Sequence, residues 1–75
     1  AQYYRTWLMR LEGHPRATWE PEIDAARQTY RLIAERADAR GDFVAAEKAR
    51  EDLEAAVKLS RIDVKDLQGL PLPSQ

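Results

Sequence analysis

The sequence predicts an all-α fold organised around an antiparallel helical hairpin, with one helix at about 18–40 and the next at 43–60. Apolar residues recur at intervals of three and four through both segments, which is the period of one helix face. Only Gly41 and Asp42 separate the segments, and so short a link forces the two helices to pack side by side in opposite directions. The 75 residues, 1–75, make a single small domain.

A short helix is predicted for residues 2–12, before the hairpin. Its apolar positions follow helical spacing: Tyr4, Trp7, Leu8 and Leu11. Gly13 and Pro15 are predicted to end this helix. The stretch after Gly13 is predicted to be a connector, because the residue before a proline is biased away from the α region.

The first arm of the hairpin should begin near Thr18 or Glu20, since either side chain could cap a helix. Pro21 would then fall in the first turn, where its missing N–H costs nothing. The apolar seam follows the a/d spacing of a coiled coil: Ile23, Ala26, Tyr30, Ile33 and Ala37. Gly41 ends this helix, because a residue in the left-handed conformation is wanted there.

The second arm should begin at Asp42, a favourable N-cap residue. One face of it carries Phe43, Ala46, Ala49 or Arg50, Leu53, Val57 and Ser60. Residues 61–75 form an apolar tail in which Pro71 and Pro73 prevent a long helix. We expect a helical turn or a short extended piece near 63–68, followed by an irregular end.

The hairpin is predicted to assemble into an oligomer, because alanine fills much of its seam and contributes little buried apolar area. The partner is most simply another copy of the chain. The candidate contacts are the large apolar side chains Trp7, Trp19, Ile23, Tyr30, Ile33, Phe43, Leu53, Val57, Ile62 and Leu67. The alternative is a monomer in which the first helix and the tail fold back to close a three-helix core.

Neither an enzyme nor a cofactor is expected. The chain has no cysteine and a single histidine, His14, so disulfides and thiolate metal sites are excluded and no metal site is predicted. The three glycines stand apart and form no phosphate-binding loop. No apolar run is long enough to span a membrane and nothing resembles a signal peptide, so a cytoplasmic location is expected.

The first helix is the place where contact with double-stranded DNA can be argued. Its hydrogen-bond donors lie beside aromatic rings: Tyr3, Arg5, Thr6 and Arg10. The alternative is that the aromatic residues belong to the core and the arginines keep the other face solvated. Because the chain begins at an alanine inside a helical pattern, we also expect it to be a piece of a longer protein.

Two stretches together resemble a viral protein family. "YYRTWLMRLEGHPR" is similar to the recognition helix and exit turn of phage helix-turn-helix proteins, and "AARQTYRLIAERADARGDFVAAEKAREDLEAAVKLSRIDV" is similar to the oligomerisation hairpin of phage small terminase subunits. The resemblance implies a ring that binds viral DNA and regulates the large terminase subunit in the cytoplasm of a bacterial host. It assigns DNA contact to Tyr3, Arg5, Thr6 and Arg10.

A second resemblance implies protein contacts only. "GDFVAAEKAREDL" is similar to the UVR-type hairpin of bacterial excision-repair proteins and ATPase adaptors, which joins proteins through paired hairpins and has no chemistry of its own. A repeat of the tetratricopeptide type is a third alternative, although the chain offers one hairpin only.

Overall fold

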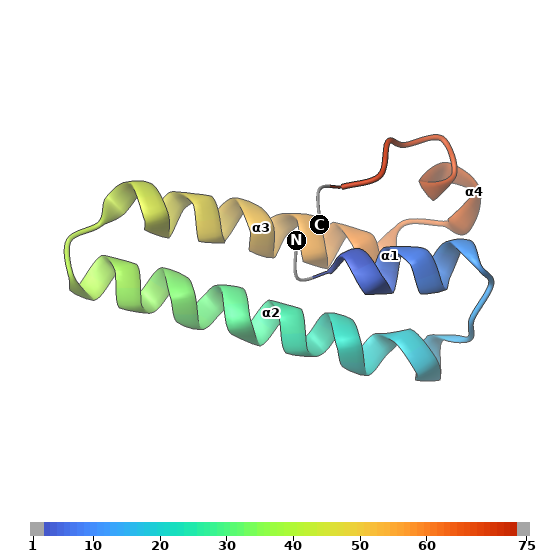
Figure 1. The fold of residues 1–75 in the computed structure, drawn as a ribbon, viewed down its shortest axis with the longest axis horizontal. Coiled ribbons are helices and arrows are strands. Elements are labelled where there is room, and N and C mark those ends of the chain that lie inside the picture. Colours follow the sequence, from blue (N-terminus) through green and yellow to red (C-terminus); the bar gives the residue numbers. More distant parts are fainter. Residues whose placement is uncertain (1–2, 74–75) are drawn as a thin grey trace.

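The computed structural model describes residues 3–73 and is helical, as the sequence predicted (Figure 1). The helices of the described chain are α1 (Tyr4–Leu11), α2 (Arg16–Ala39), α3 (Phe43–Arg61) and α4 (Val64–Leu67). The two long helices, α2 and α3, form the predicted antiparallel hairpin, and α1 and α4 lie at its open end (Figure 1). No helix in this range is long and apolar enough to cross a membrane.

Two glycines that follow helices adopt the left-handed conformation. After α1, Gly13 has φ 82°, and the N–H of His14 donates to the carbonyl of Met9 at 3.0 Å. After α2, Gly41 has φ 77°, as predicted, and the N–H of Asp42 donates to the carbonyl of Ala37 at 2.9 Å. Both bonds satisfy a carbonyl that the end of a helix leaves without a partner.

The N-cap of α3 is also confirmed. The carboxylate of Asp42 accepts a hydrogen bond from the N–H of Ala45 at 3.1 Å. This bond satisfies one of the donors that the first turn leaves free. Gly41 and Asp42 therefore end one helix and begin the next within two residues.

The predicted start of the first arm was wrong, because α2 begins at Arg16. Neither Thr18 nor Glu20 is the cap: Pro15 occupies that position in an extended conformation, and the N–H of Thr18 donates to its carbonyl at 2.9 Å. Pro21 consequently lies inside the helix, where its missing N–H removes a bond to the carbonyl of residue 17. The fixed φ of Pro15 suits the position just before a helix, which explains the earlier start.

The predicted seam of α2 is correct except at one position. Its buried residues are Trp19, Ile23, Ala26, Tyr30, Ala34 and Ala37. Ile33 is instead 42% exposed, and Ala34 takes its place. A straight helix has 3.6 residues per turn, so a step of four from Tyr30 keeps the stripe aimed at α3. The small side chain of Ala34 also lets the two helices approach closely.

The face predicted for α3 needs a similar correction. Its buried residues are Ala46, Ala49, Ala56 and Leu59. Phe43, placed on that face by the sequence, is 71% exposed in the first turn of α3. Toward the turn of the hairpin the buried residues are therefore alanines, whereas the large ones gather at the open end.

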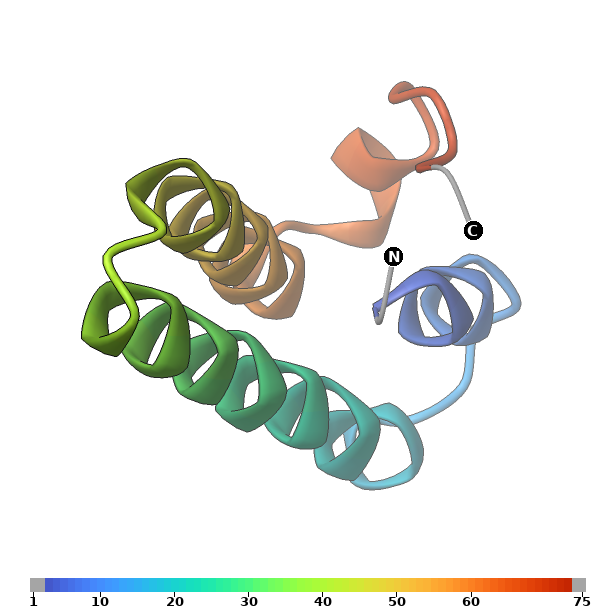
Figure 2. The ribbon, with the colours of Figure 1, turned by 60° about the vertical axis from the view of Figure 1, so that its left-hand side comes forward.

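The first helix and the tail fold back onto the open end, as the monomeric alternative required. Helix α1 packs against α2 and α4, and both lie beside the hairpin in Figure 2. The rings of Tyr3 and Tyr30 meet edge to face with centroids 6.2 Å apart. Leu67 of α4 is buried in the same cluster. The core is thus built from the N-terminal segment, both helices of the hairpin and α4.

Candidate protein-interaction surface

Three of the four residues predicted to contact DNA are buried inside the chain. Tyr3 and Arg10 are less than a tenth exposed and Thr6 is 1% exposed. Arg5 is exposed, and its guanidinium lies 3.9 Å from the carboxylate of Glu22. Helix α1 therefore presents one of the four predicted side chains to solvent.

The buried Arg10 closes the end of α3. Its Nη1 donates to the carbonyl of Leu59 at 2.7 Å and to that of Ile62 at 2.5 Å. Its guanidinium lies 4.7 Å from the centroid of the Trp19 ring, and that of Arg16 lies 4.8 Å from the same ring. Burial lowers the pKa of Arg10 from its ordinary value, and repulsion from Arg16 lowers it further. The sequence analysis assigned Arg10 to DNA contact, whereas in the structure its guanidinium binds carbonyls inside the fold.

The residues predicted to form oligomer contacts divide by location. Trp19, Ile23, Tyr30 and Leu67 are buried within the chain, so in this structure they are not available to a second copy. Trp7 is half-buried against the core, whereas Ile33 and Phe43 are exposed. The remaining three residues, Leu53, Val57 and Ile62, are half-buried and lie together along α3 and at its C-cap.

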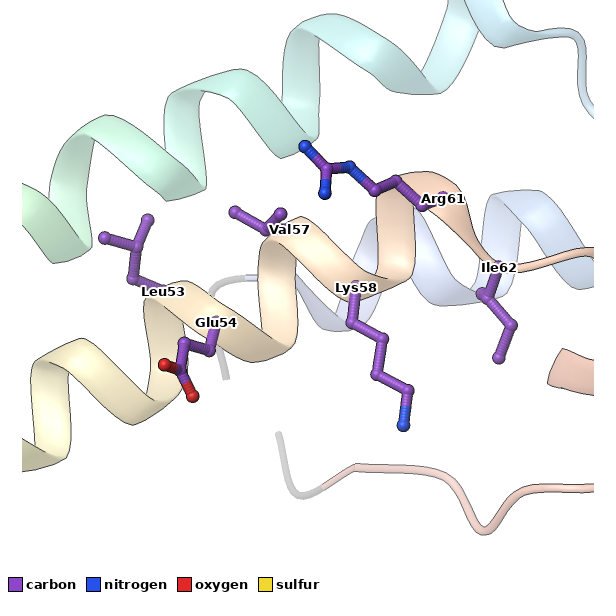
Figure 3. A pocket seen from close by; sticks show the side chains of 6 residues that line it. All are labelled: Leu53, Glu54, Val57, Lys58, Arg61 and Ile62. Atoms are coloured by element: carbon purple, nitrogen blue, oxygen red, sulfur yellow. The ribbon is translucent and has the colours of Figure 1, made fainter.

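Those three residues line an open depression on the outer side of α3, which we call the α3 groove (Figure 3). Its volume is about 590 Å³, and its lining residues are Leu53, Glu54, Val57, Lys58, Arg61 and Ile62. Helix α1 passes behind α3 in this view, so the groove lies on a face that α1 does not cover (Figure 3). Apolar and charged side chains each supply three of its six lining residues.

The three charged residues of the α3 groove have no ion-pair partner within the described chain. Ion pairs form elsewhere on the surface, for example between Lys48 and Asp52 at 2.9 Å. Glu54, Lys58 and Arg61 make none within 4.0 Å among residues 3–73, although Glu54 and Lys58 are spaced to pair along the helix. Sequence reasoning missed these three residues, because their pattern does not distinguish them from an ordinary solvated helix face.

A smaller cavity lies between α1, α3 and α4. Its volume is about 200 Å³, and it is lined by Trp7, Ala55, Lys58, Leu59, Ile62, Leu67 and Leu70. The indole N–H of Trp7 is buried and has no hydrogen-bond partner in the described part of the chain. The lining offers one charged group, Lys58, and no constellation for acid–base or nucleophilic chemistry.

Residues 3–73 contain no cluster of three or more metal-ligating side chains. No protein-family model matches the chain, and no curated protein or solved structure matches it significantly. The α3 groove is accordingly the surface from which a function can be argued.

Proposed function

We propose that the chain is a non-enzymatic assembly protein that binds further copies of itself through the exposed face of α3. The observation that carries the proposal is the α3 groove, in which half-buried apolar side chains lie beside charges that have no partner in the described chain. Exposed apolar patches rimmed by polar residues are typical of protein contacts. Neighbouring charges that lack partners favour a protein surface over a bound apolar molecule.

The composition of the hairpin supports the same proposal. Near the turn, the buried residues are the alanines Ala34, Ala37, Ala46 and Ala49, which bury little apolar area. Phe43 and Val44, in contrast, are among the most exposed large apolar side chains. A second chain that covers apolar surface on this hairpin would add burial that the single chain lacks.

A narrower proposal follows from the resemblance to phage small terminase subunits. It makes the assembly a ring that recruits viral double-stranded DNA to the large subunit of the packaging motor. The hairpin supports the assembly part of this proposal, whereas on α1 only Arg5, of the four residues named for DNA contact, is free to approach DNA. The alternative, a paired hairpin of the UVR type, needs no DNA contact.

Light scattering coupled to size-exclusion chromatography tests the assembly. We expect the molar mass to exceed the 8.6 kDa of one chain at micromolar concentration and to fall on dilution. Eight or more subunits would favour the terminase-like ring, and two would favour the paired hairpin. A mass of one chain at every concentration would contradict the assembly proposal.

A substitution in the groove locates the contact. We expect Val57→Lys to shift the mass toward one chain, because a new ammonium would be buried in the contact close to two other cations, Lys58 and Arg61. Leu32→Lys is the matched control, since Leu32 is an exposed apolar residue on α2. Circular dichroism shows whether both variants remain folded. Equal masses for the two variants would place the contact elsewhere.

A further inference from the structure

We propose that the α3 groove binds the α3 groove of a second copy, with the two helices antiparallel about a two-fold axis between Val57 and Lys58. This inference rests on the proposed self-assembly and specifies its geometry. Three properties of the groove support it: the shape of its ridges, the order of its apolar residues and the order of its charges.

The shape of the groove is that of a helix-packing surface. Leu53, Val57 and Arg61 are spaced by four residues and point to the α2 side of α3, and Glu54, Lys58 and Ile62 form a parallel row that points to the opposite side (Figure 3). Rows with this spacing are the ridges that interlock when two helices pack. The depression between them is open over two turns and fits a ridge of another helix.

Four of the six residues are matched in kind when the helix is reversed, and the other two, Val57 and Lys58, exchange with one another. Reversal about the midpoint between Val57 and Lys58 exchanges position 53 with 62 and position 54 with 61. Leu53 of one copy then lies level with Ile62 of the other, and Glu54 faces Arg61, which lies seven residues on and so nearly on the same line of the helix surface. Contacts of this kind occur twice in a two-fold interface, because each copy contributes the same patch.

A parallel arrangement of the same two helices lacks this complementarity. It would place Glu54 against Glu54, Lys58 against Lys58 and Arg61 against Arg61. Like charges opposite one another disfavour an interface. The charge order of the groove therefore selects the antiparallel pair, in which Glu54 and Arg61 gain the partners that they lack in one chain.

A charge-exchange experiment tests the pairing directly. Glu54→Arg places a new guanidinium opposite Arg61 twice in every pair, and Arg61→Glu places a new carboxylate opposite Glu54 twice. Each variant alone should associate about tenfold or more weakly than the wild type at low salt. An equimolar mixture of the two variants should recover association as a heterodimer, because each of its two charge sites pairs an acid with a base.

 Both charge sites are matched in that heterodimer. At one site the new guanidinium faces the new carboxylate, and at the other Arg61 of the first variant faces Glu54 of the second. Every acid then faces a base, which is why association should recover.

The matched controls exchange charges on a different face. Glu35→Arg and Arg31→Glu alter exposed residues of α2 that form no ion pair in the described chain. Both controls should associate like the wild type, alone or mixed. Sedimentation equilibrium gives the dissociation constants, and native mass spectrometry distinguishes a heterodimer from two homodimers.

The outcomes separate the pairing from the assembly on which it rests. Recovery in the mixture, with no effect in the controls, supports the two-fold contact. If the wild type associates and the groove variants do so equally well, or if mixing recovers nothing, the pairing is overturned and the proposed assembly stands. A wild type that remains one chain at all concentrations overturns both. A ring would need a second surface besides this one.

Discussion

The guanidinium of Arg10 lies at the C-terminal end of α3, where the last carbonyls of a helix lack partners and its dipole is negative. It donates to the carbonyls of Leu59 and Ile62 and stacks on the ring of Trp19. One side chain thus joins α1, α2 and the end of α3. These contacts offset the unfavourable burial of a cation.

Replacing Arg10 should therefore affect folding. We expect Arg10→Met to lower the free energy of unfolding by about 2–3 kcal/mol, because two charge-assisted bonds disappear and the α3 carbonyls remain buried. Urea denaturation followed by circular dichroism measures the change. Arg5→Met is the control and should cost less than about 1 kcal/mol, since the ion pair of Arg5 is exposed. An equal loss of unfolding free energy in the two variants would contradict a structural role for Arg10.

Tyr3 gives the protein a pH dependence at the alkaline end. Burial raises the pKa of its phenol from the ordinary 10.0, and the nearby carboxylate of Asp52 raises it further. The folded state therefore holds the phenolic proton more tightly than the unfolded state. Its contribution to stability is complete below pH 10 and is lost as the pH rises through the raised pKa.

Tyr3→Phe should weaken this alkaline dependence. The phenyl ring keeps the edge-to-face contact with Tyr30 but has no proton to lose. Melting temperatures between about pH 9 and pH 11 should fall less steeply for the variant than for the wild type. Tyr4→Phe, at a less buried residue, is the control. Parallel curves for Tyr3→Phe and the wild type would contradict the prediction.

At the scale of elements, the turn between α2 and α3 depends on the conformation of Gly41. A Cβ at this position would meet nothing within 4 Å, so space does not restrict the residue. Its φ of 77° does, because side chains other than glycine are strained there. A substitution at Gly41 would therefore destabilise the turn through backbone strain and not through a steric clash.

A pair of glycine substitutions tests that statement. We expect Gly41→Ala to lower the free energy of unfolding by about 1–2 kcal/mol, from the cost of the left-handed conformation. Gly69 lies outside that conformation, and a Cβ there would be 3.5 Å from the carbonyl oxygen of Asp66, an ordinary contact. Gly69→Ala should therefore change the stability by less than about 0.5 kcal/mol. Urea titration of both variants measures the difference.

In the whole molecule, the two faces of the hairpin have different roles. Helix α1 and the tail lie at its open end (Figure 2), where Tyr3 and Leu67 join the core that the hairpin helices build. The outer face of α3 and the region around the turn are left without such a cover. These uncovered regions include the α3 groove, through which we propose that further copies bind.

DNA binding, if it belongs to the assembly, must come from many weak contacts. One chain offers Arg5 on α1, and a ring would repeat that cation once per subunit. In a titration of double-stranded DNA with salt, Arg5→Ala should reduce the slope of log affinity against log salt by about 0.9 for each phosphate that the arginine neutralises. Arg31→Ala, on α2, is the control. An unchanged slope for Arg5→Ala would remove α1 from DNA contact.

Local chemistry determined much of the fold. Gly41 and Asp42 end one helix and begin the next through bonds among neighbouring residues, so the sequence alone was enough to predict the hairpin. The start of α2 was missed because Pro15 can precede a helix as well as interrupt one. Within the candidate site, Leu53, Val57 and Ile62 were predicted from apolar periodicity, whereas the pattern does not distinguish the charges beside them from an ordinary solvated face.

By itself, the sequence determined the helical class, the hairpin and the absence of thiol chemistry, because these depend on residue type and short-range spacing. Tertiary structure decided that the α3 groove is left uncovered and which arginines of α1 are exposed or buried. Arg5 and Arg10 look alike in the sequence, yet one meets solvent and the other reaches carbonyls about fifty residues away. Contacts over such separations depend on how helices pack, and local periodicity does not encode that.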